Sequence, residues 1–239
     1  MSAAMNYRSN LVAPDLRPYF KYTNERVMPY SMGHDVLSDF ADKADDDPVF
    51  GVHKRCGFWT LDEAAILYNC ASQFGGPALD IGGHTGWTGA YLADSVKSFV
   101  LIIDPMYSND LFLSRTHENL HSYLSGGGLS VPPTVMAIPS TSSDYFKDNK
   151  SKFSVIVIDG NHSAPYPLED AQNSAKHLTD RGLILLHDYR GEPIKEAYRW
   201  LLANGFQGKT YRTPNGVAVC WRGEFTPPMH VHDPGIPEV

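Results

Sequence analysis

The chain has 239 residues, of which 42% are hydrophobic, and a net charge of -7 at pH 7. This length suits one substantial α/β domain with additions, and the acidic balance argues against a nucleic-acid partner, because phosphate neutralisation needs clustered Lys and Arg. No apolar run approaches the roughly 20 residues that span a bilayer, and the first residues lack the order of a signal peptide. We therefore expect a cytoplasmic protein that binds a small molecule and no membrane.

The three cysteines and the two ends of the chain carry little chemistry. Cys56, Cys70 and Cys220 show no metal-type spacing and are expected to be small core residues in a reducing compartment. Residues 1–56 are expected to form an extension over the domain, and residues 223–239 a proline-rich tail without regular structure. The tail histidines His230 and His232 are expected to lie in solvent.

A predicted helix over residues 57–72 opens the regular part of the chain. Thr60 and Glu63 form a T-x-x-E capping box at its start. Strands are then predicted over 78–81, 99–103, 134–138, 153–159 and 183–187, and helices over 86–93, 110–124, 168–178 and 193–204. Near-continuous apolar strands such as VIVI and LILL indicate a sheet covered on both faces. The segment GKTYRT-PNG-VAVCWR predicts a closing β-hairpin.

The most informative stretch is ALDIGGHTGWTGAYLA, followed by VLIIDP. An apolar strand containing Asp80 ends in a turn rich in glycine (Gly82, Gly83 and Gly86), a helix follows, and the next strand ends on Asp104. This order is typical of a nucleotide-type ligand lying across the carboxyl edge of a parallel sheet. The glycines allow close approach of the ligand, and the acid can accept hydrogen bonds from both ribose hydroxyls.

The D-x-G-x-x-x-G form of this turn resembles motif I of the class I S-adenosylmethionine-dependent methyltransferases. The resemblance implies a Rossmann-like α/β fold whose sheet has seven strands, mostly parallel, with a C-terminal antiparallel hairpin and flanking helices. It also implies S-adenosylmethionine as cofactor, with seven binding residues: Asp80, Gly82, Gly83, Gly86, Asp104, Ser140 and Ser142. An NAD-type oxidoreductase shares the ribose-binding logic, but its sheet would continue with parallel units instead of a hairpin.

A second group of residues follows the fourth and fifth predicted strands: Asp159, His162, His187 and Asp188. The carboxyl ends of neighbouring parallel strands meet at one edge, so these side chains should converge beside the glycine-rich turn. Two carboxylates with imidazoles can form a divalent metal site. Alternatively, the acids cap the following helices and the histidines bond loop carbonyls.

The span VIVIDGNHSAPYPLEDAQNSAKHLTDRGLILLHDY resembles a block of the metal-linked small-molecule O-methyltransferases, which include macrolide sugar O-methyltransferases and relatives from cephalosporin clusters. With GFWTLDEAAILYNCA, the resemblance covers residues 57–222. It implies metal ligands at Asp159, His187 and Asp188, a general base at His162, and a helix or loop anchor at Asp170. Where the macrolide enzymes place two acids in a row, this chain has His187 and Asp188, which biases the site toward Mn²⁺, Fe²⁺ or Zn²⁺ over Mg²⁺.

The sequence thus predicts transfer of a methyl group from S-adenosylmethionine to a hydroxyl of a small molecule, assisted by a divalent metal. Residues 1–56 would lie over the acceptor site, residues 57–222 would form the methyltransferase domain, and 223–239 the tail. A non-catalytic cofactor-binding protein of the same fold is the other alternative. The identity of the acceptor and a homo-oligomeric state stay open.

Overall fold

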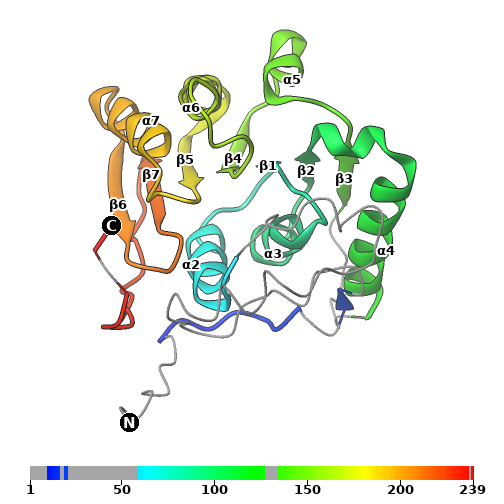
Figure 1. The fold of residues 1–239 in the computed structure, drawn as a ribbon, viewed down its shortest axis with the longest axis horizontal. Coiled ribbons are helices and arrows are strands. Elements are labelled where there is room, and N and C mark those ends of the chain that lie inside the picture. Colours follow the sequence, from blue (N-terminus) through cyan, green and yellow to red (C-terminus); the bar gives the residue numbers. More distant parts are fainter. Residues whose placement is uncertain (1–9, 17–18, 21–58, 127–133, 237) are drawn as a thin grey trace.

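A computed structural model describes residues 10–16, 19–20, 59–126, 134–236 and 238–239. These residues form one sheet of seven strands with helices on both faces (Figure 1). Most of the predicted N-terminal extension, including Cys56, lies outside the described residues. No helix in the described part of the chain is long and apolar enough to cross a membrane.

Helices and strands alternate through the centre of the chain. In chain order they are α2 (Leu61–Ala71), β1 (Ala78–Ile81), α3 (Trp87–Val96), β2 (Val100–Ile103), a 3-10 helix (Pro105–Ser108), α4 (Asp110–Gly126), β3 (Val135–Ile138), α5 (Ser142–Asp148), β4 (Phe153–Ile158), α6 (Tyr166–His177), β5 (Leu178–Leu186), α7 (Glu192–Ala203), β6 (Gln207–Tyr211) and β7 (Val217–Arg222).

The strands follow the spatial order β3-β2-β1-β4-β5-β7-β6. Strands β1 to β5 pair in parallel, whereas β7 runs antiparallel to both β5 and β6. This arrangement confirms the predicted sheet with its closing hairpin. The oxidoreductase alternative predicted that the sheet would continue with parallel units, and the chain does not form such a sheet.

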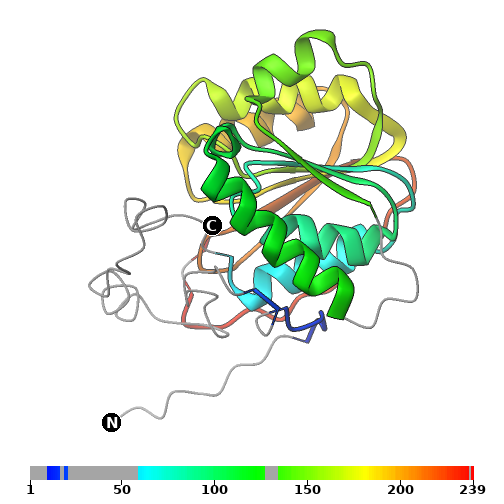
Figure 2. The ribbon, with the colours of Figure 1, turned by 90° about the vertical axis from the view of Figure 1, so that its right-hand side faces the viewer.

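Alternate residues of the buried strands face two separate cores. In β4, Val155 and Val157 pack with α2, α3 and α4, while Ile156 and Ile158 pack with α5, α6 and α7. Figure 2 shows the sheet between these two helical layers. Strands such as β4 are therefore almost continuously apolar because both of their faces are buried, as the sequence indicated.

Two elements differ from the predictions. Strand β5 begins at Leu178 rather than at Leu183, because Leu178 pairs with Phe153 ahead of a register shift. The polar residues 179–181 are partly or fully exposed, so they break the apolar run without ending the strand. Helix α5 was not predicted, since it has only 7 residues, too few to show helical periodicity, although Thr141 caps it.

The tail has no helix or strand in its described residues, but part of it is buried. The His230 side chain is only 3% exposed, and its Nε2 lies 2.7 Å from a carboxylate oxygen of Asp62 in α2. The expectation that His230 lies in solvent is therefore wrong. The tail is also held by Lys209 and Tyr211, both of which donate to the carbonyl of Pro228. These contacts join residues that are distant in sequence, so no local sequence pattern could have predicted them.

Candidate active site

The glycine-rich turn after β1 lies directly against the end of β4. Gly82 has a φ of +87°, and a Cβ on it would be 2.3 Å from the carbonyl oxygen of Asp159. Only glycine tolerates both this backbone conformation and this approach. The predicted cofactor turn and the predicted metal acid are thus brought into contact through their backbones.

Asp104 occupies the position predicted for the ribose-binding acid. Its carboxylate accepts hydrogen bonds from the backbone N–H groups of His84 at 3.0 Å and Met106 at 2.9 Å. His84 has a φ of 42°, a conformation that non-glycine residues seldom adopt. The acid therefore fixes the glycine-rich turn on one side and the start of the 3-10 helix on the other, which orients it before any ligand binds.

Asp80 lies beneath the turn rather than at its surface. It is fully buried and accepts a hydrogen bond from the hydroxyl of Thr88 at 2.5 Å. Burial raises the pKa of Asp80 to about 7. It supports the turn from below, while Gly86 caps α3 and packs toward Leu120 of α4.

The structure does not bring Ser140 and Ser142 to the glycine-rich turn. The Ser140 hydroxyl bonds the carbonyl of Thr141, and the Ser142 hydroxyl donates to Asp170 of α6. Burial raises the pKa of Asp170 to about 6. Asp170 joins α5 to α6, in keeping with its predicted role as an anchor, whereas cofactor binding by the two serines stays a prediction.

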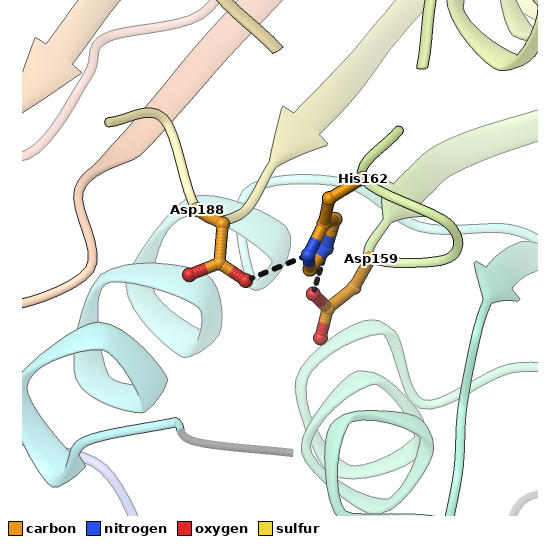
Figure 3. A group of neighbouring side chains, drawn as sticks. All are labelled: Asp159, His162 and Asp188. Atoms are coloured by element: carbon orange, nitrogen blue, oxygen red, sulfur yellow. Dashed lines mark ion pairs between the residues drawn. The ribbon is translucent and has the colours of Figure 1, made fainter. Parts of the chain in front are cut away.

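The second predicted group does converge at the ends of β4 and β5. His162 Nε2 lies 3.4 Å from Asp159 Oδ1, and its Nδ1 lies 3.3 Å from Asp188 Oδ2 (Figure 3). The hydrogen bond to Asp159, helped by the charge of Asp188, raises the pKa of His162. Asp188 has a φ of 53°, so its backbone takes up a left-handed conformation at this point.

His187 is enclosed by acids on both sides of its ring. Its Nδ1 lies 3.1 Å from Asp159 Oδ1 and 3.4 Å from Asp188 Oδ2, and its Nε2 lies 3.3 Å from Glu63 Oε2. Burial would lower the pKa of His187, but Asp159 and Asp188 raise it well above its usual value. Burial would likewise raise the pKa of Asp159, but His187 and His162 hold it below its usual range.

These contacts bear on the predicted metal ligands. Asp159, His162 and Asp188 each offer a ligand atom, and these atoms all lie within 4.8 Å of one another. The three residues therefore fit a divalent cation of the kind that takes oxygen and imidazole ligands. His187 was predicted as a ligand, but it is not one of these three residues, and its Nε2 faces Glu63 on the side away from Asp159 and Asp188. The geometry favours His162 as the imidazole closest to such an ion.

Trp59 and Glu63 belong to this site, although the sequence analysis gave them no role in it. The Trp59 indole N–H donates to Asp159 Oδ2 at 2.7 Å, and its ring stacks on His187 with centroids 4.3 Å apart. The capping box predicted for Thr60 and Glu63 is confirmed, but Glu63 also faces His187. The sequence carried a signal for the cap and none for these contacts.

A cavity of about 1100 Å³ joins the two groups of residues. Its described lining includes the glycine-rich turn, Asp104 and Met106 at one end and the side chains that follow β4 and β5 at the other. Arg190 and Asn215 complete the second end. This volume is large enough for a nucleotide-sized ligand and a second small molecule side by side.

Comparisons with known proteins agree with this fold. Residues 79–189 match the family described as "Methyltransferase domain". Among similar solved structures, precorrin-6y C5,15-methyltransferase from Geobacter metallireducens has a TM-score of 0.56 and 12% identity, covering 71% of this chain and 92% of that one. An O-methyltransferase from Bacillus cereus, in complex with SAH, has a TM-score of 0.51 and 13% identity, covering 80% and 92%. No curated protein matches the sequence.

The strand order, the glycine-rich turn and the acid after β2 together define a class of enzyme. The match over residues 79–189 and the strand order support a class I S-adenosylmethionine-dependent methyltransferase. A similar fold also occurs in a protein described as a decarboxylase, precorrin 8w decarboxylase from Methanobacterium thermoautotrophicum (TM-score 0.51, 22% identity, 70% of this chain and 92% of that one). The acceptor and the mechanism must therefore be argued from the site itself.

Proposed function

We propose that the protein transfers a methyl group from S-adenosylmethionine to a hydroxyl oxygen of a small molecule, and that a divalent metal assists. The observation that carries this proposal is the convergence of Asp159, His162 and Asp188 at 4.8 Å or less, in the cavity that also holds the glycine-rich turn. The acidic balance of the chain favours a small molecule over nucleic acid as the acceptor.

The donor end of the cavity follows from the positions of Asp104 and the turn. We expect Asp104 to accept hydrogen bonds from the ribose hydroxyls and the backbone of Gly82 and Gly83 to approach the methionine moiety. The sulfonium already activates the methyl group, so the protein has to align the two reactants and accept one proton.

The acceptor end supplies the proton acceptor. His162 lies on the loop after β4, and 43% of its side chain is exposed, so its ring can turn toward a hydroxyl in the cavity. We propose that neutral His162 takes the proton of that hydroxyl as the oxygen attacks the methyl carbon. The oxygen–carbon bond forms as the carbon–sulfur bond breaks, and the bond electrons stay on sulfur.

Asp159 and Asp188 would hold the metal, and a ring nitrogen of His162 lies within 4.8 Å of their ligand atoms. A bound divalent cation polarises a coordinated hydroxyl and lowers its pKa. Trp59 at Oδ2 and His187 at Oδ1 hold the two oxygens of the Asp159 carboxylate in place. The site resembles the metal-linked O-methyltransferases in its two acids and departs from them at His187.

The test is a transfer assay with S-adenosylmethionine labelled in its methyl group and a panel of sugars, catechols and hydroxylated metabolites, with and without Mn²⁺. Label should pass to an oxygen of at least one compound, and a chelator should stop the transfer. Transfer to nitrogen or carbon would refute the assignment of the acceptor atom. Transfer at the full rate in excess chelator would refute the metal, and no affinity for S-adenosylmethionine would refute the enzyme itself.

A further inference from the structure

Glu63 is a fully buried carboxylate at the start of α2, and its partners include the neighbouring Thr60 and two residues distant in sequence, His187 and Asn215. Its Oε2 accepts from the backbone N–H of Thr60 at 2.9 Å and lies 3.3 Å from His187 Nε2. The backbone N–H of Asn215 donates to Oε1 at 2.9 Å, and the Asn215 side-chain amide donates to Oε2 at 3.0 Å. A buried acid with this many partners needs each of them, because an unpaired buried charge is costly.

Helix capping alone does not account for this arrangement. A capping box requires the hydrogen bonds between Thr60 and Glu63, and glutamine serves in it as well as glutamate. The contacts with His187 and Asn215 lie beyond the helix, and both of these residues line the cavity. The negative charge therefore faces the site, whereas the cap needs only an oxygen acceptor.

His187 transmits this contact to the acids of the site. One ring nitrogen faces Glu63, and the other lies 3.1 Å from Asp159 and 3.4 Å from Asp188. The ring cannot rotate or withdraw without breaking contacts on both sides, and Trp59 stacks on its face at 4.3 Å. The spacing of the two acids thus depends on a side chain that Glu63 anchors.

We propose that Glu63 is a positioning residue, which acts through His187 to hold Asp159 and Asp188 at the spacing that a divalent cation requires. This inference rests on the proposed function, since it assigns the two acids to a metal. Outer partners of metal ligands orient those ligands, and their replacement costs metal affinity even though they never contact the ion.

The experiment compares Glu63→Gln with Thr60→Ala in the full chain. Glu63→Gln keeps an oxygen for the cap and removes the charge that faces His187, whereas Thr60→Ala weakens the cap and keeps that charge. We expect Glu63→Gln to lower Mn²⁺ affinity, measured by electron paramagnetic resonance, by about tenfold or more. Thr60→Ala should lower the melting temperature and leave Mn²⁺ affinity unchanged. Both should bind S-adenosylmethionine like the parent.

A second measurement does not depend on metal. In protein labelled with ¹⁵N-histidine, the His187 ring resonances, assigned with His187→Asn, should move in Glu63→Gln and stay in place in Thr60→Ala. Unchanged Mn²⁺ affinity and unchanged His187 resonances in folded Glu63→Gln would overturn the proposal. A parent protein that binds no Mn²⁺ would instead refute the metal, and the resonances alone would then decide whether Glu63 positions His187.

Discussion

Asp104 offers the most direct test of cofactor binding, through the substitutions Asp104→Ala and Asp104→Asn. Its side chain is buried, and each of its oxygens already accepts one backbone N–H, from His84 and from Met106. A carboxylate oxygen has capacity for a further hydrogen bond, so the two ribose hydroxyls can bind without displacing these donors. Alanine removes all of these contacts, while asparagine keeps the shape of the side chain.

The expected loss follows from the number of bonds. A hydrogen bond to a charged group contributes about 1.5–3 kcal/mol, so losing two in Asp104→Ala should cost about 3–6 kcal/mol, or roughly 10²–10⁴ in affinity. Asparagine loses the charge and one acceptor, for roughly a tenfold to hundredfold loss. Its amide nitrogen must also face one of the two backbone N–H groups, which should loosen the backbone either at His84 or at Met106.

Calorimetric titration with S-adenosylmethionine and with its demethylated product measures this loss, and circular dichroism checks that each variant is folded. Asp110→Asn makes the same chemical change at an exposed acid at the start of α4 and should bind like the parent. If folded Asp104→Asn and Asp104→Ala bound the cofactor with parental affinity, the assignment of Asp104 to the ribose would be wrong.

Three further outcomes are expected. His162→Ala should lower kcat by about a hundredfold or more and leave the cofactor Kd unchanged. The rate of the parent should rise with pH through a value above about 6.5, because Asp159 raises the pKa of His162 and only the neutral ring accepts a proton. A variant with the parental rate and pH profile would exclude His162 as the base. Chelation should stop methyl transfer without weakening cofactor binding, and added Mn²⁺ should restore the transfer at least as well as Mg²⁺. Restoration by Mg²⁺ alone would contradict an imidazole near the ion. Burial raises the pKa of Asp170 to about 6, so the protonated side chain stabilises the fold below about pH 4, and this stabilisation is lost as the pH rises through 6. Between about pH 4 and 6 the melting temperature of Asp170→Asn should therefore change less than that of the parent. Equal changes in the two proteins would refute the raised pKa.

The sequence alone determined the order of the fold and the place of the cofactor. Apolar runs predicted all five parallel strands, and the turn around Asn215 predicted the hairpin that distinguishes this sheet from a dinucleotide-binding one. The sequence predicted the positions of the glycines after β1 and of Asp104 after β2, because backbone conformation and strand-end position are local properties. The carboxyl-edge rule placed Asp159 and Asp188 together for the same reason.

Only the tertiary structure decided how the site is assembled. Trp59 meets Asp159 across 100 residues of sequence, and Glu63 meets His187 across 124. The resemblance implied His187 as a metal ligand, yet the fold places its Nε2 against Glu63, and it is His162 whose ring nitrogen lies within 4.8 Å of ligand atoms of both Asp159 and Asp188. Secondary structure and strand-end position follow from neighbouring residues, but hydrogen-bond partners follow from packing, which brings distant segments together and leaves no periodic signal along the chain.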